Sequence, residues 1–340
     1  MTHMEKLDPH ERPPDSVRNV YKKYQKMKPK DLDQDPELIA INPGSTVPHA
    51  DGISLVAELD PARLHQVLHA FSPSTSDGVF ADSPVPVFEH DDMPGLHIIP
   101  SLLPPEIQQI LLSKLLHRDL ANPAHLTNIH THYKIGYPST ESFFSMSPHP
   151  SSHVATPLDP SVHRPLTVSQ LLNRKMRWMT LGGQYDWTQK RYPDSAPPAF
   201  PSDIKELLEG IFTSTKAEAA IVNLYSPGDT LSMHRDVAED CDRGLISISL
   251  GCDAIFVIGT TSEGGAETVL TLRLRSGSAV YMSGSSRFAW HGVPQIVPGT
   301  CPLYLQQWPA DDTNDQYKEW RGWMSSKRVN LNVRQMWEAS

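Results

Sequence analysis

The sequence predicts an α+β fold, mainly β, whose core is a double-stranded β-helix of the jelly-roll or cupin-like type with flanking helices. From Ala219 onward, short β-rich runs are broken by turn residues, a texture typical of a sandwich or jelly roll and not of a parallel α/β sheet. Helical periodicity is confined to earlier segments, and 340 residues suffice to bury a large core. The predicted strands span 219–225, 245–250, 254–259, 268–274, 278–282 and 328–334.

The first 94 residues are expected to form an N-terminal extension. Residues 16–30 place Val17, Val20, Tyr21 and Tyr24 at helical spacing among lysines, which predicts a short basic amphipathic helix. An arm that docks its aromatic side on the domain is favoured over a dedicated nucleic-acid or nuclear-import element. Residues 31–95 are rich in Pro, Asp, Ser and Gly, so we expect an extended wrap with one helix at 61–71.

A domain spanning 95–340 follows in this interpretation. Residues 96–99 predict a strand, Pro104 and Pro105 open a helix, Thr167 caps another, and a further helix spans about 202–212. Residues 120–165 lack periodicity and are expected to be an insertion loop. Its histidines match no metal-ligand spacing, so polar loop roles are expected for His125, His130, His132, His149, His153 and His163.

The composition narrows the class of protein. The formal net charge of −9 gives no global positive field, so any nucleic-acid binding would depend on a local patch. The three cysteines form no CxxC pair, which argues against a disulfide framework or a cysteine zinc site. The sequence contains no apolar run close to the roughly 18–20 residues that span a bilayer and no signal-peptide core. We expect an intracellular protein of the nucleus or cytoplasm, with the mitochondrion left open.

The strongest chemical signal is His234 and Asp236, two positions apart, with the distant His291. In an extended segment residues i and i+2 point to the same side, so both can reach one metal ion. Two histidines and one carboxylate hold one face of an octahedral Fe(II) and leave the other face open. The alternative, three ordinary polar loop residues, is disfavoured by the motifs on either side.

Two strands accompany this pattern. Upstream, Asn223 and Tyr225 alternate onto one strand face. Near the C-terminus, the period-2 pattern of 328–334 places Arg328, Asn330, Asn332 and Arg334 on one face. Inward arginines need anionic partners, and a dicarboxylate such as 2-oxoglutarate would satisfy both. The alternative is a structural ion pair on the sheet.

Together these motifs resemble the AlkB-type Fe(II)/2-oxoglutarate dioxygenases, from about Gly95 to Trp337 and interrupted by the insertion. The phrases LISISLGCDAIFVIG, SGSSRFAWHGVP and RWMTLGGQYDW look most like the branch of the first eukaryotic AlkB homologue. The position between the two arginines that is usually Thr is Asn332 here, which leaves both arginines intact.

The resemblance implies a role for each motif. His234, Asp236 and His291 would bind Fe(II), while Arg328 and Tyr225 would hold the distal carboxylate of 2-oxoglutarate. The proximal end of 2-oxoglutarate and the surroundings of the metal would be served by Arg334, Asn223 and Asn330. O₂ would be the second co-substrate, and the products would be succinate, CO₂ and formaldehyde.

The resemblance also implies a nucleotide-recognition lid at about 182–193 and a nucleic-acid substrate whose base is flipped out or single-stranded. Four lid residues are candidates for stacking on a base or contacting phosphates: Tyr185, Trp187, Lys190 and Arg191. The alternative for the aromatic residues is that they only pack the lid on the core. The expected activity is oxidative N-demethylation of methylated bases, with tRNA or other RNA favoured over DNA.

Two other functions stay open at this point. One is an iron/2-oxoglutarate hydroxylase or demethylase acting on protein, and the other is a binding module with a vestigial metal site. We expect a monomer that does not act at a membrane. The methylated base, RNA versus DNA, and cleavage at abasic sites are not determined by the sequence.

Overall fold

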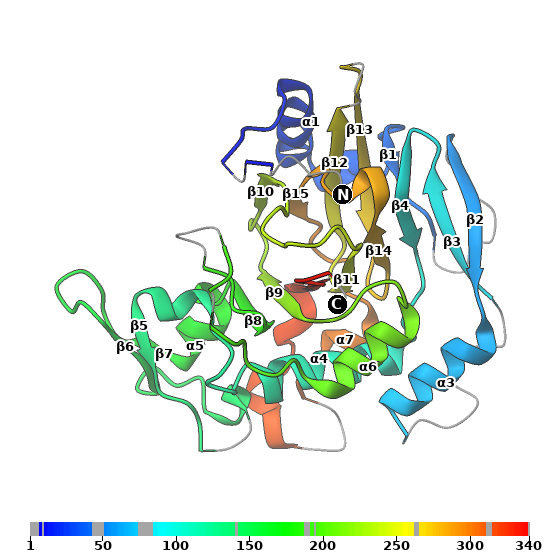
Figure 1. Ribbon diagram of the computed structural model, residues 1–340. Helices are drawn as coiled ribbons and strands as arrows, with labels where there is room; N and C mark the ends of the chain where they lie inside the picture. The colour runs from blue at the N-terminus through cyan, green and yellow to red at the C-terminus, as the bar shows by residue number, and fades with distance from the viewer. Residues whose placement is uncertain are drawn as a thin grey trace.

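Two large β-sheets form the centre of the molecule, and a small third sheet lies at its edge (Figure 1). The computed structural model describes residues 7–8, 10–42, 51–73, 84–139, 142–186, 191–193, 195–261, 265–310 and 315–338. Among these residues, no helix is both long and apolar enough to cross a bilayer. Trp187 and Lys190, two of the expected lid residues, lie outside the described residues.

The smaller of the two large sheets has five strands, in the order β1 (Leu38–Ile39), β13 (Glu267–Leu274), β12 (Ala254–Thr261), β15 (Trp290–Ile296) and β10 (Leu231–His234). The larger has eight, in the order β2 (Ile53–Leu59), β3 (Val85–His90), β4 (Met93–Ile99), β14 (Ala279–Met282), β11 (Leu245–Gly251), β16 (Arg328–Arg334), β9 (Ala219–Tyr225) and β8 (Trp178–Gly182). The third sheet comprises β5 (Tyr133–Ile135), β6 (His153–Pro157) and β7 (Leu166–Thr167).

The chain passes back and forth between the two large sheets. Strands β9, β11, β14 and β16 belong to the larger sheet, and β10, β12, β13 and β15 belong to the smaller one. Paired strands in these two sets run antiparallel. This is the connectivity of a double-stranded β-helix, so the predicted jelly-roll core is confirmed.

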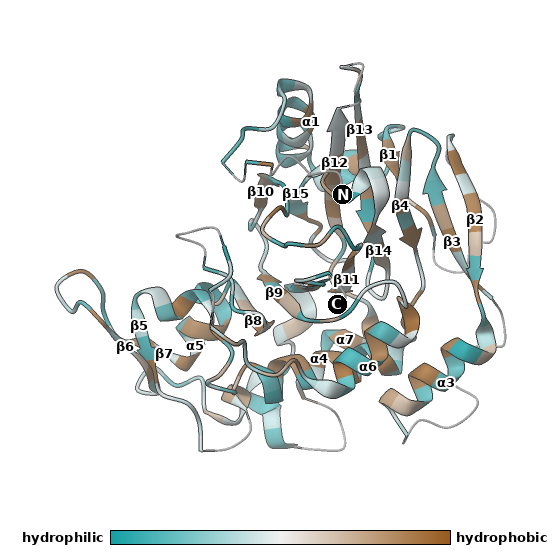
Figure 2. Cartoon of the chain, viewed as in Figure 1, coloured by the Kyte–Doolittle hydropathy of each residue, from teal (hydrophilic) through white to brown (hydrophobic). Residues whose placement is uncertain are grey.

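Helices cover the outside of the sheets. In Figure 1, α1 lies at the top beside the smaller sheet, and α3, α4 and α6 lie along the bottom. Hydrophobic and hydrophilic residues alternate along α3 and α6, which pack against each other (Figure 2). The α-helices are α1 (Asp15–Lys26), α2 (Pro29–Leu32), α3 (Pro61–Phe71), α4 (Pro105–Ser113), α5 (Val168–Gln170), α6 (Ser202–Ile211) and α7 (Leu303–Gln306).

Short 3₁₀ and π segments complete the described helices. They are η1 (Lys114–Asp119), η2 (Asn128–Thr131), η3 (Phe143–Ser145), η4 (Leu171–Lys175), η5 (Gly284–Ser286), η6 (Asp315–Trp320) and η7 (Trp323–Ser326). Side chains cap two of the helices, at the expected Thr167 and also at Asp60. Pro61 is the first residue of α3, after Asp60, whose side chain accepts from the Ala62 N–H. Thr167 and Gln170 form a reciprocal capping box at the start of α5.

The N-terminal residues are more integrated than the expected extended wrap. Strand β1 pairs in parallel with β13, and β2 and β3 extend the larger sheet beyond β4. Phe88 of β3 is fully buried opposite Ile98. Proline, aspartate and serine dominate the composition of 31–95 and obscure these short strands. The division into an N-terminal extension, 1–94, and a domain, 95–340, stays a prediction.

The expected insertion loop also contains regular structure. Within 120–165, β5 and β6 pair with each other, and Phe143 and Phe144 are buried. These strands are three and five residues long, too short for periodicity to reveal them. The histidines found here make ordinary contacts, as when the His125 Nδ1 donates to the Asp119 carbonyl at 2.9 Å.

Candidate active site

His234, Asp236 and His291 come together at one end of the jelly roll. His234 is the last residue of β10 and is paired in register with His291 of β15. Their ring centroids are 4.4 Å apart, and the His234 Nε2 lies 3.6 Å from the Asp236 Oδ1. One ligand atom from each of the three side chains lies within 4.8 Å of the others, so the group could hold a metal ion.

Backbone carbonyls orient both imidazole rings. The Nδ1 of His234 donates to the Ser232 carbonyl at 2.9 Å, and the Nδ1 of His291 donates to the Ala289 carbonyl at 3.0 Å. A carbonyl oxygen only accepts, so in each ring the Nδ1 carries a proton and the Nε2 is the nitrogen that could bind a metal ion. Both rings therefore present the correct nitrogen to a metal ion before it binds.

The electrostatics of the group suit a divalent cation. Burial, followed by the neighbouring charge of His234, lowers the pKa of His291 to about 4, so this ring is neutral at physiological pH. Burial acts to raise the pKa of Asp236, but the neighbouring charge of Arg334 outweighs it and holds that pKa well below its usual range. The set thus contains a neutral imidazole and a carboxylate that stays ionised.

Arg334 of β16 holds the carboxylate. Its Nη2 donates to the Asp236 Oδ2, and its Nε lies 3.3 Å from the Glu239 Oε1. Arg334 thus contacts a candidate metal ligand directly, and its role toward 2-oxoglutarate and the metal stays a prediction. The alternative of a structural ion pair describes the contact of Arg334 with Asp236, and this contact fixes Asp236 in place.

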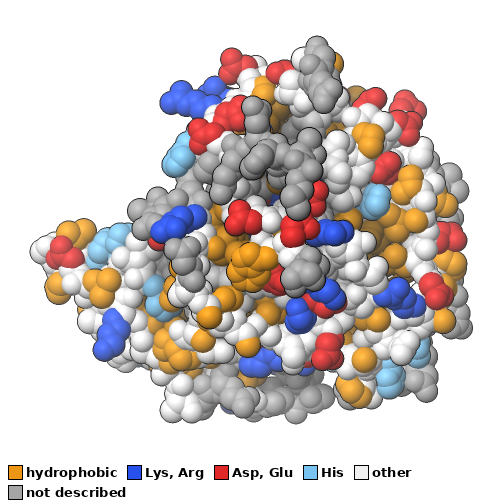
Figure 3. Space-filling model, viewed as in Figure 1, with side chains coloured by type: hydrophobic (Ala, Val, Ile, Leu, Met, Phe, Trp, Pro, Cys, Tyr) orange, Lys and Arg blue, Asp and Glu red, His pale blue; other side chains and the backbone are white. Residues whose placement is uncertain are grey.

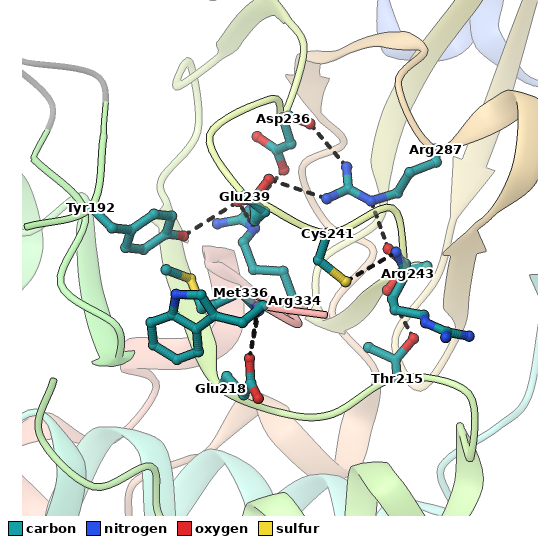
Figure 4. Close-up of polar contacts among 12 residues, drawn as sticks. Tyr192, Thr215, Glu218, Asp236, Glu239, Cys241, Arg243, Arg287, Arg334 and Met336 are labelled. Carbon is teal, nitrogen blue, oxygen red and sulfur yellow. Dashed lines mark hydrogen bonds and ion pairs between the residues drawn. The ribbon is translucent and has the colours of Figure 1, made fainter. Parts of the chain in front are cut away.

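Arg287 and Glu239 extend this network (Figure 4). The Arg287 Nη2 pairs with the Glu239 Oε2 at 3.1 Å, and its other nitrogens donate to the carbonyls of Asp236 and Arg243 at 2.9 and 2.7 Å. Sequence reasoning did not select either residue. A glutamate three positions after Asp236 has no periodic signal, and Arg287 lay unassigned in the turn before His291.

The second arginine of β16 is in a different situation. Arg328 is 1% exposed, its Nη2 donates to the Ser249 Oγ at 3.0 Å, and its guanidinium lies 5.2 Å from the centre of the Tyr225 ring. Its Nε and Nη1 are buried without a hydrogen-bond partner among the described residues, as is the Tyr225 hydroxyl. The Tyr225 hydroxyl and the Arg328 guanidinium interact electrostatically, but they form no hydrogen bond of normal geometry.

A buried guanidinium with two unused donors fits an anionic ligand. An unpaired buried cation is strongly destabilising, and a carboxylate would accept from both unused nitrogens. The phenol beside it could donate to the same carboxylate. The observed donor set therefore fits one end of a dicarboxylate such as 2-oxoglutarate.

Strand register explains why these residues meet. Arg328 pairs with Tyr225, and Asn330 pairs with Asn223, between the neighbouring strands β16 and β9. Residues directly opposite each other on paired strands point to the same face, as the alternation predicted. Asn330 also donates to the Ser247 Oγ at 2.9 Å, so this amide is fixed by β11.

The described part of the lid lies against the same network. Tyr185 packs edge-on against Tyr192 with a centroid distance of 5.2 Å, and Asp186 and Arg191 form an isolated β-bridge. The Tyr192 hydroxyl donates to the Glu239 Oε1 at 3.5 Å (Figure 4). Burial, followed by the charges of Asp236 and Glu239, raises the pKa of Tyr185 to about 12, so this half-buried phenol stays protonated.

Comparisons with known proteins agree with this geometry. Residues 95–334 match the family described as the 2OG-Fe(II) oxygenase superfamily. A protein of Pyricularia oryzae named N6-methyladenosine RNA demethylase ALKB1 is 45% identical over 358 residues, covering 98% of each chain. One of Cryphonectria parasitica named N6-methyladenosine RNA demethylase ALKBH is 50% identical over 61% of this chain and 99% of its own. A protein of Schizosaccharomyces pombe named tRNA demethylase abh1 is 42% identical, over 74% of this chain and 82% of its own.

The family match covers both paired strands, the histidine–aspartate–histidine group and the two arginines of β16. The full-length relative extends the similarity across the N-terminal strands and helices as well. This chain belongs to the 2OG-Fe(II) oxygenase superfamily, as an AlkB-type dioxygenase of the branch of the first eukaryotic AlkB homologue.

Proposed function

We propose that this protein is an oxidative N-demethylase of methylated bases in nucleic acid, with RNA as the favoured polymer. The observation that carries the proposal is the histidine–aspartate–histidine group in the same jelly roll as the unsatisfied Arg328–Tyr225 pair. The choice of nucleic acid is supported by the names of the relatives, two of which are N6-methyladenosine RNA demethylases and one a tRNA demethylase.

We assign a role to each residue of the site. His234, Asp236 and His291 would hold Fe(II), and Arg334 would orient the Asp236 carboxylate. Arg328 and Tyr225 would bind the distal carboxylate of 2-oxoglutarate, while Asn223 and Asn330 line the same face of the sheet. When bound, Fe(II), 2-oxoglutarate and O₂ supply the oxidising chemistry, which no protein side chain can provide alone.

The protein's own contribution is to position the substrate and exclude water. Tyr185 packs against Tyr192, whose hydroxyl donates to Glu239 of the network around Asp236, so a base held by Tyr185 would lie beside this network. Arg191 is exposed and suited to a phosphate. Trp187 and Lys190 stay predicted members of this group.

The surface charge is consistent with local recognition. On the face shown in Figure 3, acidic and basic side chains surround a central group of hydrophobic ones. With a net charge of −9, the whole molecule does not attract a polyanion, so contacts near the site must select the substrate. Monomeric state and an intracellular location stay predictions.

The test is formaldehyde release by the purified chain with Fe(II), ascorbate and 2-oxoglutarate. Single-stranded RNA carrying N6-methyladenine, a tRNA stem-loop carrying 1-methyladenine, and DNA carrying N6-methyladenine are compared, with His234→Ala as the control. We expect formaldehyde from an RNA substrate and none from the variant.

Other results would change the proposal in defined ways. Release from the DNA alone would keep the activity and change the polymer. Succinate without formaldehyde from any oligonucleotide would overturn demethylation of nucleic acid and favour a protein substrate. Neither product, from protein shown to hold iron, would contradict an oxygenase function with these substrates.

A further inference from the structure

A groove lies beside the network that holds Asp236. It has a volume of about 610 Å³ and lies between the segment after the lid, the loop after the histidine–aspartate pair, and the C-terminal residues. Its lining includes Arg191, Tyr192, Ala238, Asp240, Met336 and Trp337. The role assignments above use none of the last four residues.

Trp337 is the most unusual residue in this groove. Its side chain is 48% exposed, and it is the one aromatic residue among the large hydrophobic side chains that are exposed in the described chain. An indole offers a large flat apolar face with one polar N–H at its edge, which suits stacking against another flat ring. The exposed part of Trp337 therefore offers such a face to the groove.

The backbone under Trp337 is fixed. Its N–H donates to the Glu218 Oε2 at 3.2 Å, its carbonyl accepts from the Gln335 Nε2 at 2.7 Å, and it forms a parallel bridge with Asp240. The adjacent Met336 N–H donates to the same Glu218 oxygen at 2.7 Å (Figure 4). The ring is thus presented from a well-anchored strand end, which lowers the entropy lost on stacking.

A chain of side-chain contacts links the groove to the candidate active site. Tyr192 lines the groove and donates to Glu239, which pairs with Arg334, the residue that holds Asp236. Tyr192 also packs against Tyr185 of the lid. The groove therefore lies beside the candidate active site, on the side of Tyr192.

We propose that this groove binds the nucleotide next to the modified base, with that neighbouring base stacked on the indole of Trp337. The inference rests on the proposed function and names a binding residue for it. The indole supplies a flat π surface that accepts any base, and Arg191 supplies a cation for the adjoining phosphate.

The experiment compares a short and a long substrate with the full chain, Fe(II) and 2-oxoglutarate. The short one is N6-methyladenosine 5′-monophosphate, and the long one is a single-stranded RNA of about nine nucleotides with one central N6-methyladenine. For Trp337→Leu we expect roughly a tenfold increase in KM for the long RNA, an unchanged kcat, and no change with the mononucleotide. Trp337→Phe should restore most of the lost affinity.

The matched control is Leu303→Ala, at an 83% exposed residue of α7 that does not line this groove. Thermal melting and succinate formation without RNA should be equal in wild type and all three variants. A KM for the long RNA that Trp337→Leu leaves unchanged would overturn the proposal. Equal losses with the long and short substrates would also overturn it.

A direct binding measurement separates this proposal from the proposed function. Fluorescence anisotropy of an unmodified nine-nucleotide RNA with the wild-type chain does not require turnover. If no RNA yields formaldehyde, weaker binding by Trp337→Leu and recovery by Trp337→Phe would still support the groove. Equal binding by wild type and Trp337→Leu would reject it.

Discussion

At the scale of single residues, the two arginines of β16 have opposite surroundings. Arg334 has two carboxylate partners, Asp236 and Glu239, whereas two nitrogens of Arg328 have no hydrogen-bond partner among the described residues. Both are buried on the same strand face, six positions apart. The difference assigns one arginine to the support of a candidate metal ligand and the other to the binding of an anion.

Arg328→Met tests the second assignment. The methionine keeps the apolar length and loses the charge, so the KM for 2-oxoglutarate should rise about tenfold to a hundredfold, since bonds to charged groups contribute about 1.5–3 kcal/mol. The thermal midpoint of the ligand-free variant should equal or exceed that of wild type, because an unpaired buried charge is removed.

Steady-state succinate formation and a thermal melt measure these two effects. Arg164→Met, at an exposed arginine, is the control and should change neither value. A ligand-free protein that is clearly destabilised by Arg328→Met would show that the guanidinium has a structural partner instead.

Glu239→Gln tests the support of Asp236. The amide keeps the shape but removes the charge that pairs with both Arg287 and Arg334, so the orientation of Arg334 should loosen. Loss of a group that positions a metal ligand weakens metal binding by about 10- to 100-fold. Calorimetric titration with Mn(II), as a stable substitute for Fe(II), measures the metal affinity.

The control is Glu209→Gln, which removes a surface partner of Lys205 and Lys216 and should leave the Mn(II) affinity unchanged.

At the scale of elements, α1 is part of the domain surface and not a free arm. Its buried residues pack on the smaller sheet, where Gly259 leaves room for Val17: a Cβ there would lie 2.6 Å from a Val17 methyl carbon. Gln295 of β15 donates to the carbonyls of Tyr24 and Met27. Ahead of the helix, the Glu11 Oε2 lies 2.5 Å from the Nη2 of Arg235. In the sequence, Arg235 stands between the candidate metal ligands His234 and Asp236.

Tyr24→Ala should measure the strength of this docking. The ring is fully buried in a cluster with Leu32, Ile255, Val257 and Val297. Removing a buried aromatic side chain costs about 3–5 kcal/mol, so the free energy of unfolding should fall by that amount in a urea titration. The exposed neighbour Gln25→Ala is the control. A loss well below 1 kcal/mol would mean that the helix detaches without unfolding the sheets.

At the scale of the whole molecule, buried neutral histidines make stability depend on pH. Burial lowers the pKa of His117 to about 4, and its ring stacks on Tyr317 at 4.4 Å. In the unfolded chain the pKa of histidine is about 6.5, so between roughly pH 4 and 6.5 the unfolded state binds more protons. This stabilisation is complete above about pH 6.5 and decreases as the pH falls through that window.

We therefore expect the free energy of unfolding of the metal-free protein to fall by about 2 kcal/mol between pH 7.5 and pH 5 because of His117 alone. Urea titrations at both pH values measure it, and His117→Phe should show a smaller difference than wild type. His291, whose pKa is also lowered by burial, should account for part of the remaining difference. The control is His149→Phe, at an exposed histidine. If His117→Phe loses as much unfolding free energy between the two pH values as wild type does, the pH dependence does not come from His117.

The sequence by itself determined six strands of the jelly roll, but not β10 and β15, which carry His234 and His291. Alternation along 219–225 and 328–334 is a local property, so Asn223 was expected to share a face with Tyr225, and Arg328 with Asn330, in agreement with the pairing of the two strands. The spacing of His234 and Asp236 is equally local. The helix at 61–71 was expected from the sequence, and the structure shows that Asp60 caps its start.

Only the tertiary structure decided which charges meet. The partners of Arg334 and Arg287 lie 98 and 48 positions away in the chain, and no periodicity encodes a contact of that kind. The same holds for β1, β2 and β3, whose short segments become strands by pairing with neighbours already in place. The exposure of Trp337 beside the lid likewise depends on where the last strand ends in space. Local patterns determine secondary structure and the strand face on which each side chain lies, whereas ion pairs and grooves form between segments that meet only in the folded chain.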